Sequence, residues 1–324
     1  MKNLAVTLLV PSLLVLQPSC DLPLPEQFTL KSTSSLPEGV AYDGVTHTFF
    51  ATAINGGQIT RVTPLAQEIV FHADADPNRS FGGAHVDEAH RLLWVCVVDV
   101  KTNPFPTSQV WGFNIESKKV ARKVPLPPVS FCNDLVTDDA GNVYVTDSAN
   151  PSIYKIAPNS NTFSALVTAP EFAPIAPGAV GLNGLDLSPD GERLVVVKTF
   201  PASIFSVPLA DPQAFVAVQT SGDAFGGPPG DPRFPGPDGA EFFGDELYVV
   251  YDGGVQQLSF SGDDWSQASV RTTTAVPSGL TSVTTTADDL YVIDSEVFRT
   301  LYLGLPPILP FTILHLDPAL FEPS

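Results

Sequence analysis

Positive charge is scarce in this sequence. The 324 residues include 16 Lys and Arg against 35 Asp and Glu, which gives a formal net charge of −19 at pH 7. A protein that binds nucleic acid needs clustered cations to neutralise the phosphates. Nucleic acid is therefore excluded as the expected partner.

Cysteine and long apolar runs are scarce as well. Cys20, Cys96 and Cys132 form no CxxC pair or Cys/His cluster, which argues against a zinc site. The apolar run 301–316 has 16 residues and contains three prolines, so it is too short to cross a bilayer and no transmembrane segment is expected. Cys96 and Cys132 would be able to pair in an exported protein, and two separate buried thiols are the alternative.

The first residues have the order of a secretory signal peptide. Lys2 precedes two apolar stretches separated by Pro11, and these total about 14 residues, too few for a membrane span. We therefore predict a signal peptide over 1–20, an exported protein, and one mature domain over 21–324. Cys20 ends this segment in a manner similar to bacterial lipoproteins, so a lipid anchor at Cys20 is an alternative.

Proline and glycine are abundant in this sequence, whereas charged residues are few. The chain has 32 Pro and 24 Gly, and its charged residues reach only 16%, against roughly 25% in an average domain. Hydrophobic residues at 44% and aromatic residues at 10% exclude a disordered chain. This composition indicates a globular protein with many turns and few long surface helices.

Six segments share one plan of a Gly-containing start, an Asp- and Gly-rich turn, a β-rich run and a second amphipathic strand. Their equivalent starting points are taken as Glu38, His85, Asn133, Asn183, Asp238 and Gly279. The steps between these points run from 41 to 55 residues with a mean of about 48, the length of a four-stranded propeller blade.

The repeat predicts an all-β fold, a single six-bladed β-propeller with four-stranded blades around a central channel. The alternating segment Glu26–Ser32 is expected to close the ring against the last blade. No window of a dozen residues shows a convincing period of 3.6, so helix should be minor. The Pro- and Gly-rich segment Phe225–Gly239 is the longest irregular insertion and is expected on the same face as Asp238.

Four blade starts carry oxygen ligands: Glu38, Asn133, Asn183 and Asp238. The first residue of each innermost strand should lie near one mouth of the channel, where these side chains would converge. Two carboxylates and two amides suit Ca²⁺ better than zinc or copper, and another divalent cation would also fit. The alternatives are that these residues only cap turns, or that the ion is purely structural.

The motifs around these positions resemble one known family. PEGVAYD, CNDLVTDDAGNVYVTDS, LNGLDLSPDG and PDGAEFFGDELYV are similar to motifs of the gluconolactonase, regucalcin and senescence-marker-protein propellers, with paraoxonases and diisopropylfluorophosphatases as more distant relatives. The resemblance covers essentially the whole mature chain. It implies that Glu38, Asn133, Asn183 and Asp238 bind a catalytic calcium, and that the protein opens lactones or cleaves phosphotriesters.

One departure from the family pattern bears on the substrate. Sugar-lactone hydrolases of the family commonly have an arginine two residues before the third-blade asparagine, where this chain has Phe131. A sugar acid is therefore in doubt, and Phe131 is a candidate substrate-binding residue. Further Phe residues fall near strand connections and would favour an apolar substrate, although packing is the alternative: Phe81, Phe105, Phe200 and Phe225.

The candidate proton-transfer residues are His85 and Asp238. His85 lies in a segment similar to the one that carries the paraoxonases' histidine, and a neutral imidazole beside calcium would accept a proton from water. A channel-lining His that only forms hydrogen bonds is the alternative. Asp238 is expected to act first as a ligand and second in orienting water. Asp134 follows Asn133 and is a candidate for supporting the site or the substrate.

Three hypotheses for function follow from these residues. The leading one is an exported calcium-dependent hydrolase of lactones or other esters that acts on a small-molecule substrate. The second is a biosynthetic propeller similar to strictosidine synthase, which would catalyse condensation or cyclisation. The third is a non-catalytic ligand-binding propeller with a structural calcium. No GxSxG elbow, phosphate-binding loop or GxGxxG turn precedes a helix, so other hydrolase and nucleotide-binding classes lack support.

Overall fold

Runs rich in Val and aromatic residues form the strands of the protein. A computed structural model describes residues 23–99, 107–221, 225, 236–251, 253–273, 276–277 and 279–321. The strand β7 (Leu92–Asp99), with the sequence LLWVCVVD, is buried along nearly its whole length, as expected for a strand between stacked sheets. The outer strand β5 (Glu68–Ala73) is largely exposed. The predicted signal peptide and Cys20 lie outside the described residues.

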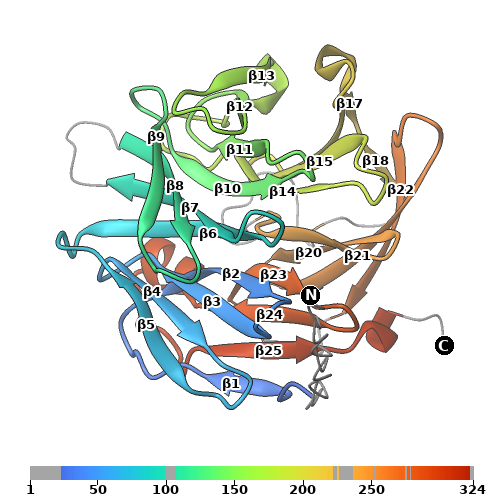
Figure 1. The fold of residues 1–324 in the computed structure, drawn as a ribbon. Coiled ribbons are helices and arrows are strands. Elements are labelled where there is room, and N and C mark those ends of the chain that lie inside the picture. Colours follow the sequence, from blue (N-terminus) through green and yellow to red (C-terminus); the bar gives the residue numbers. More distant parts are fainter. Residues whose placement is uncertain are drawn as a thin grey trace, which may run out of the picture.

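The first three blades are four-stranded antiparallel sheets whose strands follow one another in chain order. Their remaining strands are β2 (Pro37–Asp43), β3 (Thr48–Ala53), β4 (Gln58–Val62), β6 (Arg79–Asp87), β8 (Thr107–Asn114), β9 (Val120–Pro125), β10 (Cys132–Thr137), β11 (Val143–Asp147), β12 (Ser152–Ile156) and β13 (Ser164–Thr168). Figure 1 shows these blades from blue to light green.

The later blades vary this plan. Their strands are β14 (Leu182–Leu187), β15 (Arg193–Lys198), β16 (Ser203–Pro208), β17 (Val216–Ala217), β18 (Gln219–Ser221), β19 (Ala240–Phe243), β20 (Glu246–Tyr251), β21 (Gly254–Ser261), β22 (Gln267–Thr273), β23 (Leu280–Thr285), β24 (Leu290–Asp294) and β25 (Thr312–Leu316). The fifth blade has a fifth strand, because β18 pairs in parallel with β22. The expectation of four strands holds for the other five blades.

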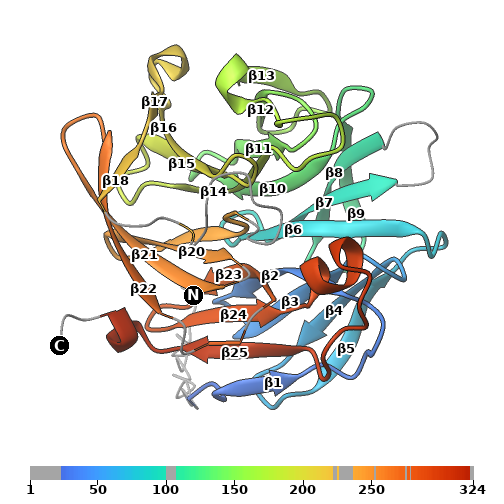
Figure 2. The ribbon, with the colours of Figure 1, turned by 180° about the vertical axis from the view of Figure 1, so that it is seen from behind.

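The ring closes as the sequence predicts. The strand β1 (Gln27–Thr29) pairs antiparallel with β25, so the two ends of the chain share the sixth blade, and blue β1 lies beside red β25 in Figures 1 and 2. The six inner strands also contact one another in a closed cycle, from β2 through β6, β10, β14, β19 and β23 back to β2. The six-bladed propeller is therefore confirmed.

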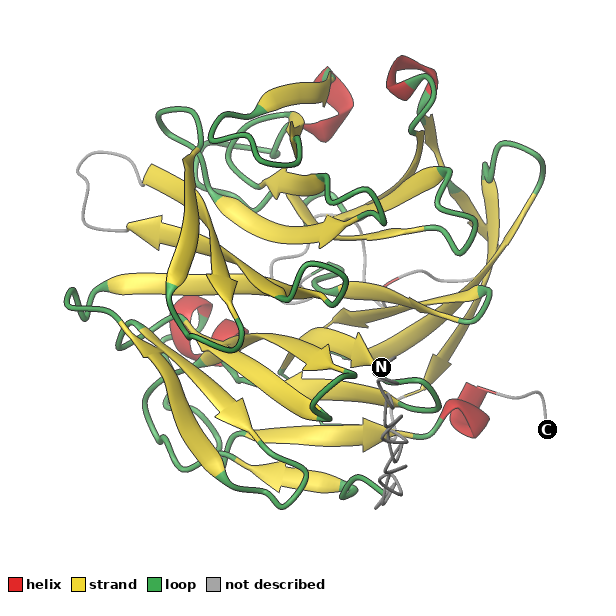
Figure 3. Cartoon of the chain, viewed as in Figure 1, coloured by secondary structure: helices red, strands yellow, loops and turns green. Residues whose placement is uncertain are grey.

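Helix is minor in the described residues, as expected (Figure 3). The short helices are η1 (Pro170–Phe172), η2 (Pro212–Ala214), η4 (Phe298–Tyr302) and η5 (Pro318–Phe321). In the part of the chain that the structure describes, no helix has the length and apolar character needed to cross a membrane.

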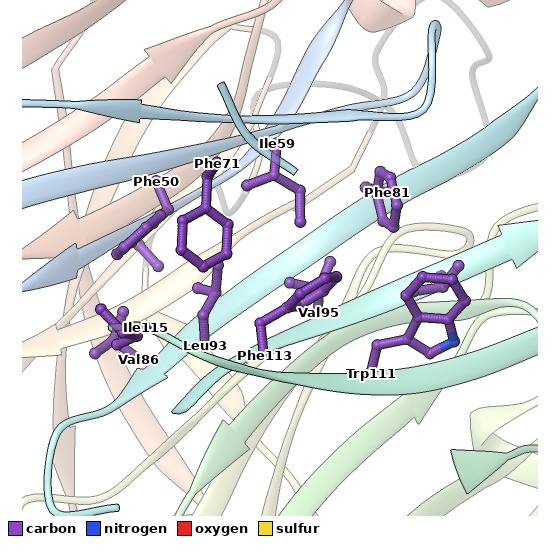
Figure 4. Packing of buried hydrophobic residues seen from close by; sticks show 12 residues of the cluster. Phe50, Ile59, Phe71, Phe81, Val86, Leu93, Val95, Trp111, Phe113 and Ile115 are labelled. Atoms are coloured by element: carbon purple, nitrogen blue, oxygen red, sulfur yellow. The ribbon is translucent and has the colours of Figure 1, made fainter. Parts of the chain in front are cut away.

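The core consists of apolar layers between neighbouring blades. Figure 4 shows the layer between the first two blades, where Phe50 and Phe71 of β3 and β5 pack with Phe113 of β8. Similar clusters fill the other five boundaries of the ring. Burying each such aromatic side chain stabilises the fold by about 1.5–3 kcal/mol, so blade stacking holds the channel in shape.

Buried hydroxyl groups also join neighbouring blades around the channel. Each donates a hydrogen bond to a carbonyl oxygen of the next inner strand: Thr52 to Gly82 (2.6 Å), Thr146 to Asn183 (2.6 Å), Thr199 to Pro237 (2.8 Å) and Thr281 to Glu38 (2.7 Å). At four of the six blade boundaries, these bonds fix the position of one blade along the channel axis relative to the next.

A disulfide joins Cys96 of β7 to Cys132 of β10, with 5.3 Å between the Cα atoms. It links the second and third blades. Of the two alternatives that the sequence leaves open, the structure therefore shows a disulfide and not two separate thiols. Because Cys132 directly precedes Asn133, the cross-link also fixes the start of the strand that carries this candidate ligand.

Candidate metal centre at the channel mouth

Backbone irregularities mark the equivalent point of five of the six inner strands. The pairing register shifts after Pro37 in β2, Phe81 in β6, Cys132 in β10, Leu182 in β14 and Leu280 in β23. Such bulges are common beside functional sites because they redirect side chains. The residues that follow these points are Glu38, Gly82, Asn133, Asn183 and Thr281, and Asp238 takes the equivalent place before β19.

This register corrects two of the equivalent points chosen from the sequence. Gly82, and not His85, stands beside Glu38 and Asn133 at the start of the second blade, and Thr281 replaces Gly279 in the sixth. From the register shift onward, residues 82–87 of β6 match residues 38–43 of β2 one for one, so His85 is the counterpart of Ala41 and was aligned three residues too far along the strand. The positions of the four oxygen-bearing residues are unaffected.

Glu38, Asn133, Asn183 and Asp238 line one cavity of about 130 Å³, called the mouth cavity below. Phe131 lines it as well, as the sequence suggests. The structure therefore brings the four predicted ligands and one predicted substrate-binding residue together at one end of the inner strands.

Hydrogen bonds fix the orientation of both asparagine amides. Asn133 donates from Nδ2 to Oγ of Ser148 at 2.9 Å, and Ser148 donates its own proton to the carbonyl oxygen of Leu182 at 2.6 Å. Because that hydroxyl proton is committed, the hydroxyl can only accept from the amide, so the nitrogen must face it. The carbonyl oxygen of Asn133 is thereby left for the mouth cavity.

Asn183 repeats this arrangement one blade later. Its Nδ2 donates to Oγ1 of Thr199 at 2.8 Å, and Thr199 donates to the carbonyl oxygen of Pro237 at 2.8 Å. Asn133 and Asn183 are only 7% and 4% exposed. Two buried amides with the same imposed orientation present two carbonyl oxygens of the type that a hard cation accepts.

Within the described part of the chain, the two carboxylates of the mouth cavity have too few hydrogen-bond donors and no cationic side chain nearby to stabilise their ionised forms. Oε2 of Glu38 is buried without a hydrogen-bond partner. Burial raises the pKa of Glu38 well above its usual value, and the charges of Asp238 and Asp134 raise it further. Burial also raises the pKa of Asp238 to about 7, although a hydrogen bond from Asn183 opposes the shift. A divalent cation would stabilise the ionised form of both groups.

Glycine at the second blade makes room for the side chain of Asp134. A Cβ atom added to Gly83 would overlap Oδ1 of Asp134, whereas one added to Gly82 would be in ordinary van der Waals contact with Oε2 of Glu38. At the equivalent point of the repeat, the second blade therefore has no side chain, whereas four other blades have an oxygen-bearing one.

Further acidic residues lie deeper in the channel. Burial raises the pKa values of Asp134 and Asp186 to about 7, and burial together with Asp186 raises the pKa of Glu241. Asp134 is not among the residues that line the mouth cavity, so the structure does not place this predicted substrate-binding residue there. Asp186 and Glu241 were missed from the sequence, although each stands three residues after a predicted ligand. Because the backbone irregularity changes the alternation of the strand, a residue at this spacing faces the channel again.

His85 lies away from the four oxygen ligands. It lines a different cavity, together with Glu241 and Thr284, that shares no described residue with the mouth cavity. It stands three residues beyond Gly82 along β6, a separation of about 10 Å in a strand. Burial lowers the pKa of His85 to about 4, so its imidazole is neutral at pH 7.

The chemistry of the donor set fits a hard divalent cation. Among the described residues no group of three or more His, Cys, Asp or Glu side chains is arranged to hold a metal ion. The predicted set contains only two residues of those types, and the two amides complete it. Carboxylate and amide oxygens at a partly open cavity match the preference of Ca²⁺ for six to eight oxygen ligands, including water.

Comparisons with known proteins agree with the fold. A family model described as the SMP-30/gluconolactonase/LRE-like region matches residues 36–296. This match contains all four predicted ligands. A comparison with curated protein sequences finds no match.

Solved structures share the architecture at low sequence identity. The major Malassezia sympodialis allergen Mala s 1 has a TM-score of 0.69 at 17% identity, over 91% of this chain and 96% of that chain. A gluconolactonase from Xanthomonas campestris has a TM-score of 0.60 at 16% identity, over 90% and 89%. A calcium-binding regucalcin from Agrobacterium tumefaciens has a TM-score of 0.61 at 13% identity, over 90% and 94%.

Proposed function

The chain belongs to the SMP-30/gluconolactonase/LRE-like family, and we propose that it is a calcium-dependent hydrolase of lactones or other esters. One observation carries the proposal: the unpartnered, buried carboxylate oxygen of Glu38 lies in the cavity where Asn133, Asn183 and Asp238 also meet. A gluconolactonase and a calcium-binding regucalcin among the similar structures support both parts of it.

The four side chains would hold the cation. Glu38 and Asp238 supply two negative charges, and Asn133 and Asn183 supply neutral oxygen atoms whose orientation Ser148 and Thr199 impose. When bound, the calcium would supply Lewis-acid polarisation of the substrate's carbonyl oxygen. The remaining coordination positions are for water and substrate.

Asp238 is the protein group that would handle the proton of water. It lines the mouth cavity, and Asn183 donates a hydrogen bond to its carboxylate. In hydrolysis the water oxygen bonds to the carbonyl carbon, the ester bond breaks, and the water proton reaches the departing alkoxide. Asp238 would orient the water and carry that proton. His85 is left out of this machinery because it lines another cavity.

We also propose that the protein is exported. The disulfide between Cys96 and Cys132 supports this, because such bonds persist in oxidising compartments. Intact-mass analysis of the protein recovered outside the cytoplasm tests it: loss of the first 20 or so residues supports cleavage of a signal peptide.

The hydrolase proposal is tested with phenyl acetate and a lactone panel, assayed with added calcium and with EDTA. Turnover that EDTA abolishes and calcium restores is expected. A calcium-raised melting temperature without turnover of any ester would instead favour a structural ion.

A further inference from the structure

The lining of the mouth cavity includes two parts: the four predicted ligands, called its polar floor below, and a set of apolar side chains, called its apolar wall. Phe131 precedes β10, Phe200 follows β15, and η4 contributes Phe298, Leu301 and Tyr302. In the view of Figure 2, the helix η4 is the red helix drawn just below β6. These side chains come from three separate parts of the chain, so the wall is formed by the fold and not by one apolar segment.

The threonine hydroxyl groups that line the cavity already form hydrogen bonds within the protein. Thr199 accepts from Asn183 and donates to the carbonyl oxygen of Pro237. Thr281 donates to the carbonyl oxygen of Glu38 at 2.7 Å. Apart from the predicted ligands, the hydroxyl of Tyr302 is thus the one side-chain group of the described lining that remains for a substrate hydroxyl.

Cationic groups are absent from the described lining of the mouth cavity. Arg299 belongs to η4, but it donates to the carbonyl oxygen of Pro306 at 2.8 Å and lies 3.7 Å from Glu296. A substrate rich in hydroxyl or acidic groups would therefore lose its hydration without finding partners, which costs binding free energy.

The apolar surface continues outward from the cavity. Leu301 and Tyr302 are 53% and 55% exposed, although they line the cavity. The following residues Leu303, Leu305 and Ile308 are exposed as well. Exposed apolar side chains gathered in one short segment mark a contact surface.

We infer that the substrates are lipophilic, namely lactones or esters that carry an alkyl or aryl substituent, and that η4 binds this substituent. The inference rests on the proposed hydrolase function, because the polar floor of the cavity positions the reacting carbonyl. A group bound at the apolar wall lies beside that floor, so we infer that it is a substituent of the molecule whose carbonyl reacts. Leu301 is the main specificity-determining residue on this account, since it both lines the cavity and extends to the rim.

The test compares γ-lactones of increasing alkyl length with glucono-δ-lactone, using the calcium-loaded full mature chain. The value of kcat/KM should rise about fourfold for each added methylene until the wall is covered. Leu301→Ser should flatten this dependence. Leu320→Ser is the matched control, because Leu320 is similarly exposed on η5 but does not line the cavity, and it should leave the dependence unchanged.

Turnover of glucono-δ-lactone in preference to the alkyl lactones would overturn the inference while the hydrolase function stands. If nothing is turned over, the hydrolase function fails and calorimetry decides the ligand class: 4-hydroxydecanoate should bind more tightly than gluconate, and Leu301→Ser should remove the difference. Equal binding would overturn the inference. An unchanged lactone dependence in Leu301→Ser with weaker binding to phosphatidylcholine vesicles would also overturn it, since η4 would then contact a lipid surface.

Discussion

Asn133 donates its amide hydrogen to Oγ of Ser148 at 2.9 Å, and this single bond determines which amide atom faces the mouth cavity. Ser148 is held in turn by the carbonyl oxygen of Leu182 on the next blade. The geometry of the candidate metal centre therefore depends on contacts between blades as well as on the ligands.

Replacing Ser148 with Ala should weaken calcium binding by about 10- to 100-fold, the usual effect of losing a group that orients a ligand. The amide of Asn133 would then be free to rotate. Calcium titration by calorimetry measures the effect. Ser206→Ala is the matched control, since Ser206 of β16 is also buried and donates to a carbonyl oxygen, that of Asp264, but does not line the mouth cavity. Equal calcium affinity in both variants would contradict the orienting role.

Replacing Glu38 with Gln should have opposite effects on binding and on stability. Calcium binding should be lost, because one of two charges disappears. In EDTA at pH 8 the free energy of unfolding should rise by about 1–3 kcal/mol, because a buried carboxylate without a partner is removed. Urea denaturation measures it, with Glu171→Gln, an exposed site, as control. A less stable E38Q protein in EDTA would show that Glu38 is already satisfied.

The metal-free protein should become less stable as pH rises from about 4 to about 7. Burial raises the pKa of Asp186 to about 7, so the folded state holds its proton at pH values where the unfolded state, with a pKa of about 3.9, has lost it. Stability due to this group is complete below the unfolded pKa and is lost as pH rises through the folded pKa.

Melting temperatures of the parent and Asp186→Asn in EDTA, measured across this range, isolate that contribution. The fall with pH should be smaller in the variant. Titration of His85 acts in the opposite direction but is common to both proteins. Parallel curves for the two proteins would show that Asp186 is ionised throughout.

Loss of the disulfide should destabilise the protein by about 4 kcal/mol, from the chain entropy of a loop closed over 36 residues. The double variant Cys96→Ser and Cys132→Ser should therefore melt several degrees lower than the parent. A thermal unfolding scan of the parent protein with and without reductant measures the same change in melting temperature without mutation. Identical melting temperatures in all three samples would mean that the bond contributes nothing to stability.

The sequence predicted the propeller because the repeat is expressed in local patterns, namely Gly-rich starts, Asp/Gly turns and Val-rich strands. It predicted four oxygen ligands because each stands at a blade start. It misplaced His85 because the second blade has Gly82 at the point equivalent to Glu38, so no polar side chain marks that point in the sequence. Ser148, Thr199 and η4 were missed because they reach the site through tertiary contacts, from positions that the repeat does not mark.

A calcium titration of EDTA-treated protein, in which heat of binding and lactone hydrolysis are followed together, tests whether the mouth cavity holds a catalytic calcium. We predict that hydrolysis returns in proportion to one bound calcium per chain, and that Asn183→Ala neither binds the ion nor recovers activity while remaining folded. Hydrolysis that is complete before calcium is added, or undiminished in Asn183→Ala, would contradict the account.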